Sequence, residues 1–486
     1  MVTSQNVADV FRSHLDDGFR LRLVACHEDA SDFRIVYVLL RSVDDRCVEL
    51  VLPVLRDEPR IPSLARLDYT VGRFEREVWD LYGVSPIDHP LPRRIVRHGH
   101  WPEDWHPMLR GADPRPEFTE DLGSFPFLSV EGDGVYEIPV GPIHAGLIEP
   151  GHFRFSVVGE TILRLKARLW FVHRGLEQRF EGRRPCDALE ISERVSGDTA
   201  VGHSLAFAMA VEDAAGIEVS HEDRLLRALL LELERMHNHI ADIGAMANDV
   251  GYGLMNAHAL RMRESLLRIN EQVTGHRLLR GGVMIGAAHV RALPSAAAIT
   301  GLAEEAQELA ALTLSNATVR DRFSGTSVLD ADSVRRLGVL GYVARASGVD
   351  IDARRDHPFV DLGDAFEVVV ESGGDVMSRY LLRVRELAVS ARIVADIVSR
   401  LDGSTGSGRV VDPVGAGAGL GFVEGWRGLI SHRVELDDEG RLTRTKIVDP
   451  SFFNWTALPV AMADTIVPDF PLTNKSFNQS YAGNDL

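Results

Sequence analysis

The stretch "SHEDRLLRALLLELERMHNHIADIG", residues 220–244, carries the clearest structural signal in the chain. Its apolar residues recur at intervals of three and four, which places them along one face of an α-helix. Ser220, followed three residues later by Asp223, forms a capping-box-like start. The apolar stripe consists of Leu226, Leu229, Leu230, Leu233, Met236, Ile240 and Ile243. We therefore predict a long amphipathic helix that packs against other helices.

A second segment of the same kind, "DVMSRYLLRVRELAVSARIVADIVSRL" (375–401), starts with Asp375, a residue type favoured at helix N-caps. Shorter helical patterns are found at 161–181, 199–215, 258–273 and 295–318. Between them and the first part of the chain lies a short β-rich region, 134–160. These patterns predict a mainly helical bundle with β decorations.

The first 112 residues have a different character. Short runs of alternating or continuous apolar residues at 19–26, 33–42 and 47–55 are typical of strands. The segment 69–84 has helical spacing, so we predict an α+β domain over residues 1–112. Residues 113–131 are rich in Pro, Gly and acidic residues, which favours a linker. The helical domain would then cover residues 132–486.

Composition excludes several classes of function. The chain has 486 residues and a net charge of −18, which argues against general binding to nucleic acid. Its three cysteines, Cys26, Cys47 and Cys186, are too far apart for a metal knuckle or redox motif. The Gly-rich run 403–421 lacks a dinucleotide fingerprint and is expected to be a surface loop. We expect neither a signal peptide nor a membrane span.

Several motifs point to one family. They are "GRFEREVWDLYGVSPIDHPLPRRI" (72–95), "GPIHAGLIEPGHFRF" (141–155), "ISERVSGDTAVGHSLAF" (191–207), "EGWRG" (424–428) and "VDPSFFNWTALPVAMADTIVPDFPLTNKSFNQSYAGNDL" (448–486). The last four resemble the large subunit of nickel–iron hydrogenases. They are closer still to its relatives: the 49-kDa-type subunit of respiratory complex I, formate-hydrogenlyase large subunits and hydrogenase-4 component G-like proteins. The first resembles the 30-kDa-type subunit of complex I. Fusion of the two modules is typical of the energy-converting hydrogenase branch.

The resemblance implies that two Cys-x-x-Cys pairs would hold a nickel–iron centre. In this chain Ser196 and Thr199 stand at the first pair, and Ser451 and Asn454 stand at the second. Hydroxyl and amide groups are weak ligands for nickel and low-spin iron, which prefer thiolates. We therefore expect no nickel–iron centre, no other bound metal and no hydrogenase activity.

The resemblance to complex I implies a different use of the same place. There the emptied cavity receives a quinone headgroup, which contacts a tyrosine of the first motif and a histidine of the first β-hairpin. Gly197 stands at the tyrosine position here, and His144 supplies the hairpin histidine. We expect residues 141–152, 196–203, 427 and 451–454 to enclose a cavity, with Asp198 and His203 in its lining and a quinone as the first candidate acceptor.

Three residues are the candidate catalytic groups: His144, Glu149 and Arg427. A carboxylate in a desolvated cleft can pass protons near neutral pH, but Glu149 fits a hydrogen-bonded turn residue equally well. The planar guanidinium of Arg427 can orient a ligand, or it can form an ion pair that fixes its loop. His203 precedes an apolar run, so packing against or capping a helix is the alternative to lining a cofactor site.

The resemblance implies a subunit of a membrane-associated oxidoreductase complex, bound peripherally at the cytoplasmic face. Electrons would come from an iron–sulfur cluster of a small partner subunit, since this chain has no cysteines placed to ligate one. Antiporter-like membrane subunits would complete the assembly, and no nucleic acid takes part. The alternative is a catalytically silent scaffold. Loss of both cysteine pairs and of the tyrosine favours the scaffold, whereas Glu149 and Arg427 favour redox chemistry.

Overall fold

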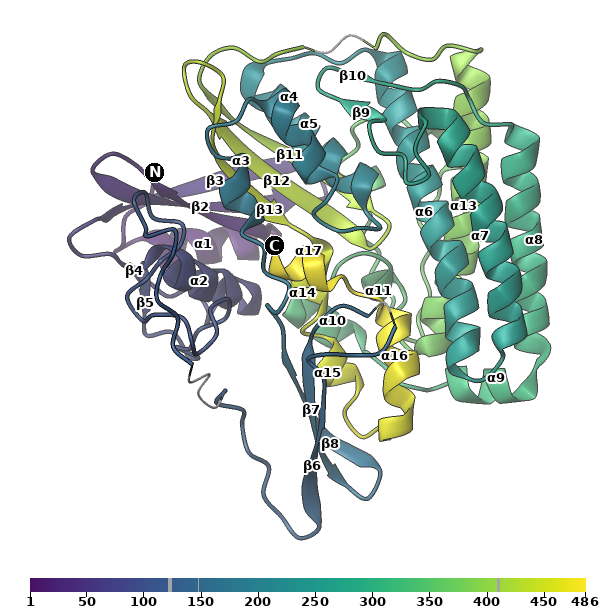
Figure 1. The fold of residues 1–486 in the computed structure, drawn as a ribbon, viewed down its shortest axis with the longest axis horizontal. Helices are drawn as coiled ribbons and strands as arrows, with labels where there is room; N and C mark the ends of the chain where they lie inside the picture. The colour runs from purple at the N-terminus through teal and green to yellow at the C-terminus, as the bar shows by residue number, and fades with distance from the viewer. Residues whose placement is uncertain (121–124, 147, 409–410) are drawn as a thin grey trace.

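The computed structural model describes residues 1–120, 125–146, 148–408 and 411–486. Its first part is an antiparallel sheet in the order β1-β2-β3, flanked by two helices and a short parallel strand pair (Figure 1). The elements are α1 (Val7–Asp16), β1 (Arg20–Glu28), β2 (Asp32–Arg41), β3 (Arg46–Leu55), β4 (Arg60–Pro62), α2 (Tyr69–Tyr82) and β5 (Ser85–Ile87). The three predicted strands and the helix predicted at 69–84 are thus confirmed.

A second antiparallel sheet, β6-β7-β8, extends away from the rest of the molecule at the bottom of Figure 1. Its strands are β6 (Val135–Val140), β7 (His152–Val158) and β8 (Thr161–Arg168). The helix predicted from residue 161 is therefore wrong over the strand β8. Leu165 pairs with Phe155 across the sheet, and Ile162 and Leu165 are buried whereas Leu163 is 41 % exposed. The eight residues of β8 include few aliphatic side chains, so their pattern fits the spacing of a helix or of a strand. Pairing with β7 selects the strand.

Long helices packed side by side form the right half of Figure 1. They are α6 (His221–Asp249), α7 (Gly253–Thr274), α8 (Ala296–Ser315) and α13 (Val376–Leu401). The Ser220 hydroxyl accepts the N–H of Asp223 at 3.0 Å, and the Asp375 carboxylate accepts the N–H of Ser378 at 2.8 Å. Both predicted caps and both predicted helices are confirmed. The apolar stripe of α6 is buried, and on α13 Leu387, Ala391 and Val394 are buried.

The remaining elements surround this bundle and connect it to the first sheet. The helices are α3 (Leu176–Phe180), α4 (Pro185–Ser192), α5 (Ala200–Ala215), α9 (Ala317–Phe323), α10 (Ala331–Leu337), α11 (Gly341–Arg345), α12 (Ala353–Asp356), α14 (Pro450–Asn454), α15 (Leu458–Ala461), α16 (Phe470–Phe477) and α17 (Tyr481–Asp485). The strands are β9 (Val283–Met284), β10 (Ala287–Ala288), β11 (Gly417–Gly425), β12 (Gly428–Leu436) and β13 (Leu442–Val448). Arg34 of β2 pairs with Glu435 of β12 at 2.8 Å, which joins the first sheet to the β11-β12-β13 sheet.

The Gly-rich run predicted to be a surface loop ends in a strand. Residues 409–410 lie outside the described residues, and β11 begins at Gly417. A Cβ atom on Gly417, Gly419 or Gly421 would lie 2.0, 2.2 or 1.9 Å from a carbonyl oxygen of α5. The alternating glycines therefore let one face of β11 lie directly on the backbone of α5. The loop prediction is wrong from residue 417, and the period-two spacing of the glycines was its missed signal.

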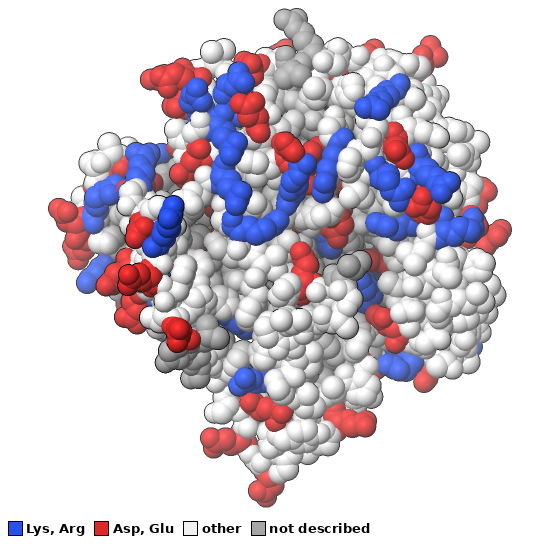
Figure 2. Space-filling view, viewed as in Figure 1, with Lys and Arg blue, Asp and Glu red and all other residues white. Residues whose placement is uncertain are grey.

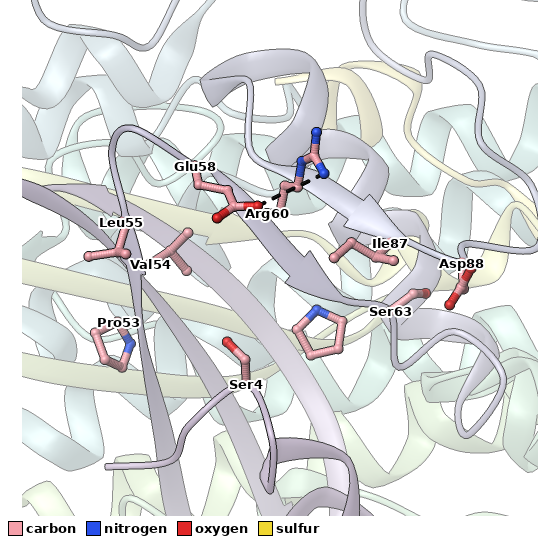
Figure 3. Close-up of a pocket in the computed structure, with 10 residues that line it drawn as sticks. Ser4, Pro53, Val54, Leu55, Glu58, Arg60, Ser63, Ile87 and Asp88 are labelled. Carbon is pink, nitrogen blue, oxygen red and sulfur yellow. Dashed lines mark ion pairs between the residues drawn. The ribbon is translucent and has the colours of Figure 1, made fainter.

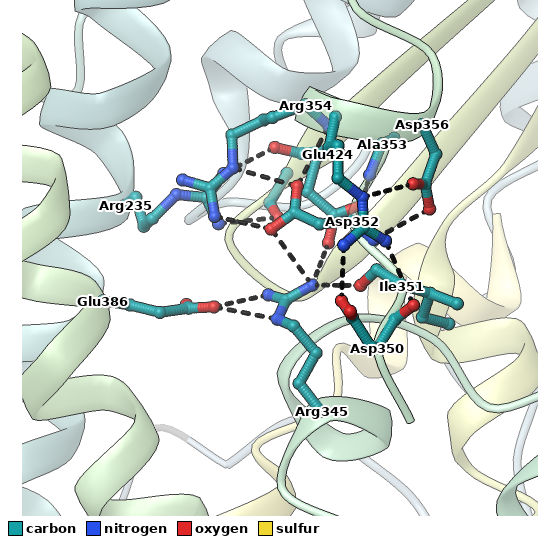
Figure 4. Close-up of polar contacts among 12 residues, drawn as sticks. Arg235, Arg345, Asp350, Ile351, Asp352, Ala353, Arg354, Asp356, Glu386 and Glu424 are labelled. Atoms are coloured by element: carbon teal, nitrogen blue, oxygen red, sulfur yellow. Dashed lines mark hydrogen bonds and ion pairs between the residues drawn. The ribbon is translucent and has the colours of Figure 1, made fainter. Parts of the chain in front are cut away.

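A buried network of ion pairs holds the bundle to the loop 345–356 (Figure 4). Arg345 is fully buried and lies 2.6 Å from Glu386 and 2.8 Å from Glu424. Arg354 lies 2.7 Å from Asp352 and donates to a further buried carboxylate on α6. Burial disfavours each isolated charge, so these groups are stable inside the protein because each cation has carboxylate partners.

In the described part of the chain, no helix is long and apolar enough to cross a membrane. The arm predicted as a linker, 113–131, contains no helix or strand among its described residues. The C-terminal segment lies at the centre of the molecule, between the first sheet and the helical bundle (Figure 1). This position brings α14 and α17 close to the loop that precedes α5.

Candidate functional site

The first motif loop, residues 193–199, connects α4 to α5. Ser196 Oγ donates to Asp198 Oδ1 at 2.9 Å, and Thr199 Oγ1 donates to the same oxygen at 3.0 Å. Both hydroxyl-bearing residues are 2 % exposed, while Gly197 lies on the outer side of the loop. Ser196 and Thr199, which stand where the family pattern has its first cysteine pair, therefore both donate to the Asp198 carboxylate.

The second motif loop forms α14 and is connected to the first through Ser480, which lies outside both loops. Ser480 donates its N–H to Ser451 Oγ at 2.9 Å, and its own Oγ lies 2.8 Å from Ser196 Oγ. Asn454 turns away: its Oδ1 accepts the N–H of Leu340 at 2.8 Å and its Nδ2 donates to the same residue's carbonyl at 3.1 Å. Ser451 thus belongs to the cluster around Ser196, and Asn454 does not.

Arg427 lies in the turn between β11 and β12, and its side chain is paired with the first motif loop. Its guanidinium forms a bidentate pair with Asp198, with both N–O distances at 2.7 Å. Its Nε donates to the Asn478 carbonyl at 2.5 Å, and its carbon Cζ lies 3.9 Å from the centre of the Trp426 ring. Arg427 is 3 % exposed and the Asp198 side chain is 37 % exposed. The arginine therefore forms a loop-fixing ion pair, one of the two roles considered from the sequence.

This pair stays charged across the physiological pH range. Burial alone raises the pKa of Asp198, but the charge of Arg427 and the hydrogen bonds from Arg427, Ser196 and Thr199 lower it far more. The net pKa of the carboxyl lies well below its usual range. Asp198 in turn raises the pKa of Arg427 above its ordinary value despite burial. Neither group is a proton donor or acceptor near neutral pH in this arrangement.

His203, on α5, bridges the two motifs inside the protein. Its Nε2 lies 2.9 Å from Asp449 Oδ2, and its Nδ1 lies 3.1 Å from Nε2 of His432 on β12. All three residues are at most 1 % exposed. Burial and the neighbouring His203 lower the pKa of His432 well below its usual range. Burial raises the pKa of Asp449, but the hydrogen bond and charge of His203, the charge of Arg427 and the contact with Ser451 together lower it below its ordinary value. His203 packs between these partners, as the alternative prediction had it.

The hairpin residues His144 and Glu149 do not join the cluster. His144 Nε2 lies 2.8 Å from the Gly151 carbonyl of its own hairpin. The Glu149 carboxylate accepts the N–H of Ala482, in α17, at 3.1 Å. Leu147, within the predicted cavity wall 141–152, lies outside the described residues. The predicted set therefore divides: five residues (Ser196, Asp198, Thr199, Ser451 and Arg427) lie together, His203 lies behind them, and His144, Glu149 and Asn454 have other partners.

The residues at the two motif loops do not fit a nickel–iron centre. Their oxygen atoms are hydrogen-bonded to one another or to the backbone, and none is a soft ligand. Among the residues that the structure describes, no group of three or more His, Cys, Asp or Glu side chains is placed to hold a metal ion. Burial raises the pKa of all three cysteine thiols, with Cys47 and Cys186 at about 12, so they are protonated at neutral pH.

Two surface features lie outside the cluster. A cleft of about 440 Å³ lies beside β3, β4 and β5, with Leu55 and Ile87 on its rim (Figure 3), far along the chain from either motif. Lys and Arg side chains form a band across the middle of the face in Figure 2, between the regions of α3 and α7. Exposed Arg174 donates to the carbonyls of Arg194 and Val195 at 3.0 and 2.7 Å, so cationic groups adjoin the first motif loop.

The geometry can be compared with known proteins. The family model described as "Respiratory-chain NADH dehydrogenase, 30 Kd subunit" matches residues 2–117, "Nickel-dependent hydrogenase" matches 174–243, and "Respiratory-chain NADH dehydrogenase, 49 Kd subunit" matches 249–414. Formate hydrogenlyase subunit 5 of Escherichia coli (strain K12) is 31 % identical over 465 residues, which covers 93 % of this chain and 82 % of the relative. The chain belongs to this family of fused complex I-type and hydrogenase-type large subunits. The resemblance stated from the motifs is confirmed.

Two further comparisons support the family. Hydrogenase-4 component G of the same Escherichia coli strain is 30 % identical and covers 93 % of this chain and 81 % of its own length. In structure, the chain is similar to a protein of an archaeal respiratory membrane complex described as a membrane-bound sulfane sulfur reductase. That match has a TM-score of 0.65 and 22 % identity and covers 73 % of this chain and 99 % of the other. It shows a shared fold. Relatives of this family are subunits of complex I-like and hydrogenase-related membrane complexes.

Three residues of the cluster were missed from the sequence: Ser480, Asp449 and His432. Asp449 stands directly before the second motif and accepts the N–H of Ser451 at 2.7 Å, so its N-cap position was a usable signal. Ser480 likewise caps the short helix α17 by accepting the N–H of Gly483 at 2.9 Å. His432 lies within an apolar strand and has no local signal. It reaches the site because β12 crosses α5.

Proposed function

We propose that this chain is the large, hydrogenase-like subunit of a membrane-associated, complex I-like oxidoreductase complex and that it carries no nickel–iron centre. The observation that carries the proposal is the closure of the two motif loops. Arg427 pairs with Asp198 of the first loop, and the Ser196–Ser480–Ser451 hydrogen bonds join the two loops through Ser480. Hydroxyl groups engaged in this way cannot replace four thiolates.

In the proposed complex, electrons come from an iron–sulfur cluster of a small partner subunit. The protonated cysteine thiols of this chain support a cluster located elsewhere. The cationic band beside the first motif loop (Figure 2) would suit an acidic partner face. Antiporter-like membrane subunits would hold the assembly at the cytoplasmic face of the membrane, with this chain bound peripherally.

A quinone is the acceptor that we propose first for the assembled complex. The residues as they lie do not fit a headgroup between the two loops, because the hydroxyls of Ser196 and Thr199 already donate to Asp198 and the guanidinium of Arg427 is fully engaged. Gly197 offers no donor in place of the family tyrosine. A headgroup bound there would require the Asp198–Arg427 pair to separate.

A scaffold without turnover is the second candidate, and the same closure favours it. A chain whose former metal position is closed by its own side chains can still hold the subunits of a complex together. The two candidates differ in one measurable respect. An acceptor reduced beside Arg427 makes turnover sensitive to that residue, whereas a scaffold makes only assembly sensitive to it.

The test begins with the intact complex, purified through a tag on this chain. We expect elemental analysis to find iron from the partner's clusters and less than about one nickel per ten complexes, since no soft ligand set is present. Stoichiometric nickel would overturn the proposal.

Reduction of a short-chain quinone by the dithionite-reduced complex is then compared between the native protein, Arg427→Ala and the exposed control Arg392→Ala. Loss of turnover in Arg427→Ala alone, with assembly intact, supports redox chemistry near Arg427. Equal rates in all three remove Arg427 from the site, and no turnover in any of them supports the scaffold.

A further inference from the structure

A second cleft, of about 320 Å³, lies at the junction of the first sheet domain with the β6-β7-β8 sheet and the C-terminal segment. Its walls come from α2, from residues 91–95, from the arm at 125–128, from β8, and from Trp455 to Pro459. We refer to it as the junction cleft. None of the residues assigned to the motif cluster lines it.

The junction cleft is lined by six cationic side chains, Arg73, Arg76, Arg93, Arg164, Lys166 and Arg168. Lys166 is paired with Glu137 at 2.5 Å. Within the described ranges, no carboxylate oxygen lies within 4.0 Å of the guanidinium groups of Arg73, Arg76, Arg93 or Arg168. These four arginines have cationic charges without a paired anion.

The four unpaired arginines donate instead to neutral oxygens, most of them backbone carbonyls. Arg76 donates to the carbonyls of Arg93 and Arg94 at 2.7 and 3.0 Å, and Arg93 donates to Pro126 at 2.9 Å. Arg168 donates to the carbonyls of Ile95 and Arg97. Carbonyl oxygens orient the guanidinium groups but carry no net charge. Burial lowers the pKa of Arg168, although carboxylates such as Asp80 and Asp485 act on it without a direct ion pair.

Burial makes this charge costly. Arg73, Arg76 and Arg168 are at most 9 % exposed, and desolvation lowers the pKa of each to about 10. The Nε atoms of Arg93 and Arg168 are buried without a hydrogen-bond partner. A desolvated cation strongly favours an added carboxylate, because the interaction is poorly screened and the guanidinium fork matches a carboxylate in geometry.

The rim of the junction cleft has the composition of a protein interface. Tyr69, Leu91 and Leu128 line it and are 50, 39 and 52 % exposed. Trp170 and Trp455 lie deeper in it. Arginine and aromatic residues are enriched in the cores of protein–protein interfaces, and partly exposed apolar side chains bind a polypeptide better than a free anion.

We propose that the junction cleft receives an acidic segment of a neighbouring subunit, which places one or more Asp or Glu carboxylates against Arg73, Arg76, Arg93 and Arg168 and its apolar side chains against Tyr69, Leu91 and Leu128. This inference rests on the proposed function, since it requires the chain to work inside a complex. Glu137, which lies beside the cleft, is already paired with Lys166 and with Arg154 at 3.5 Å.

The first test is zero-length cross-linking of the intact complex with a carbodiimide, which joins a carboxylate to an amine in direct contact. Arg93→Lys keeps the cation and introduces a reactive amine into the cleft. Arg392→Lys, on α13 and beside Glu367 at 2.7 Å in the wild type, is the matched control. We expect mass spectrometry to find residue 93 joined to an Asp or Glu of another subunit, and residue 392 joined only to this chain.

Three outcomes would count against the inference. Links from residue 93 that stay within this chain, in a complex with all its subunits, would overturn it and leave the proposed function intact. Saturable binding of inorganic phosphate or of anionic phosphatidylglycerol vesicles that Arg93→Glu abolishes, without any link to another subunit, would assign the cleft to a phosphate-bearing ligand instead. A tagged chain that purifies with no other subunit would overturn both the inference and the proposed function.

A charge-reversal pair gives the second test. Arg93→Glu with Arg164→Glu should weaken association with the neighbouring subunit by at least about tenfold, since two cations of the cleft become repulsive. Arg385→Glu with Arg392→Glu, both on the exposed face of α13, should change it less than about twofold. Equal effects of the two pairs would overturn the inference. Circular dichroism melts of both variants separate weakened association from misfolding.

Discussion

The arginines around Arg345 and the arginines of the junction cleft differ in what balances their charge. Arg345 is fully buried and shares three carboxylates, Asp352, Glu386 and Glu424, at 3.4, 2.6 and 2.8 Å (Figure 4). Arg168 is also buried, but it donates to backbone carbonyls and has no carboxylate in the described part of the chain within 4.0 Å. One cluster has its ion pairs within this chain, and the other has no carboxylate of the described residues in a direct pair.

The difference bears directly on the candidate site. Asp198 and Arg427 belong to the first kind, because each charge has its partner inside the chain. A place closed in this way needs no metal or ligand to be stable. A buried charge without a direct counterion is costly, and this cost is the basis for the partner proposed at the junction cleft. The charges at the motif loops are therefore paired within this chain. The arginines of the junction cleft are not, and it is there that we propose a partner subunit binds.

The largest expected effect comes from Arg345→Met. Removing the guanidinium leaves buried carboxylates without their main cation, which should lower the free energy of unfolding by about 3–5 kcal/mol. Urea unfolding of the purified chain measures it. Arg392→Met, which breaks an exposed pair with Glu367, serves as control and should cost less than about 1 kcal/mol. A loss in Arg345→Met no larger than in the control would show that the network does not stabilise the fold.

Glu75 gives the opposite case, a buried acid whose basic neighbour is a histidine: His89 Nε2 lies 3.7 Å away, and burial lowers the pKa of that histidine. Glu75 is fully buried, accepts the Ser63 hydroxyl and the N–H of Leu64, both at 2.6 Å, and burial raises its pKa to about 7. Its ordinary pKa is 4.5, so its contribution to stability is complete below about pH 4.5 and is lost as pH rises through about 7.

Glu75→Gln should therefore change the pH dependence of stability. The difference in unfolding free energy between wild type and Glu75→Gln should shift by on the order of 3 kcal/mol between pH 4.5 and pH 8, in favour of the variant at high pH. Urea unfolding of both proteins across this range measures it, with the exposed Glu367→Gln as control. Parallel curves for wild type and Glu75→Gln would show that Glu75 ionises in the folded protein as readily as in the unfolded chain.

Much of this fold could be predicted because its longest helices carry local signals. The segments 220–244 and 375–401 had both an apolar stripe and a cap, and both formed as predicted. The segment 161–168 failed because its eight residues fit two periods, and only pairing with β7 selects the strand. β11 was missed because glycine suggests a loop when the helix backbone against which it packs is unknown.

The candidate site was predictable only in part, for a similar reason. The motif spacing identified the loops that carry Ser196, Asp198 and Ser451, and the structure brings these together with Arg427. Ser480 joins them from the end of the C-terminal motif, and its contact with Ser196 follows from tertiary structure alone. His144 and Glu149 carried family expectations, but the backbone around them provides other hydrogen-bond partners.

A smaller loss of stability is expected for Asp198→Asn. The change removes the anion that pairs with buried Arg427, but the Asp198 side chain is 37 % exposed, so solvent screens part of the effect. We expect a loss of roughly 1–3 kcal/mol in unfolding free energy, between the values for exposed and fully buried pairs. Guanidinium unfolding measures it. The double variant Asp198→Asn/Arg427→Gln should recover part of the loss, and a double variant no more stable than Asp198→Asn would show that the ion pair is not the source of the effect.

The smallest effect should come from Arg168→Met in the isolated chain, although Arg168 is 6 % exposed and thus nearly as buried as Arg345. The variant loses hydrogen bonds to the carbonyls of Ile95 and Arg97 but also removes a desolvated charge that has no direct ion pair, and these effects oppose each other. We expect the unfolding free energy to stay within about 1 kcal/mol of wild type in urea. A loss as large as that of Arg345→Met would mean that the charge of Arg168 is already balanced within the chain. If a partner subunit supplies the carboxylate that pairs with Arg168, we expect a small loss of stability in the isolated chain together with weaker subunit association in the complex.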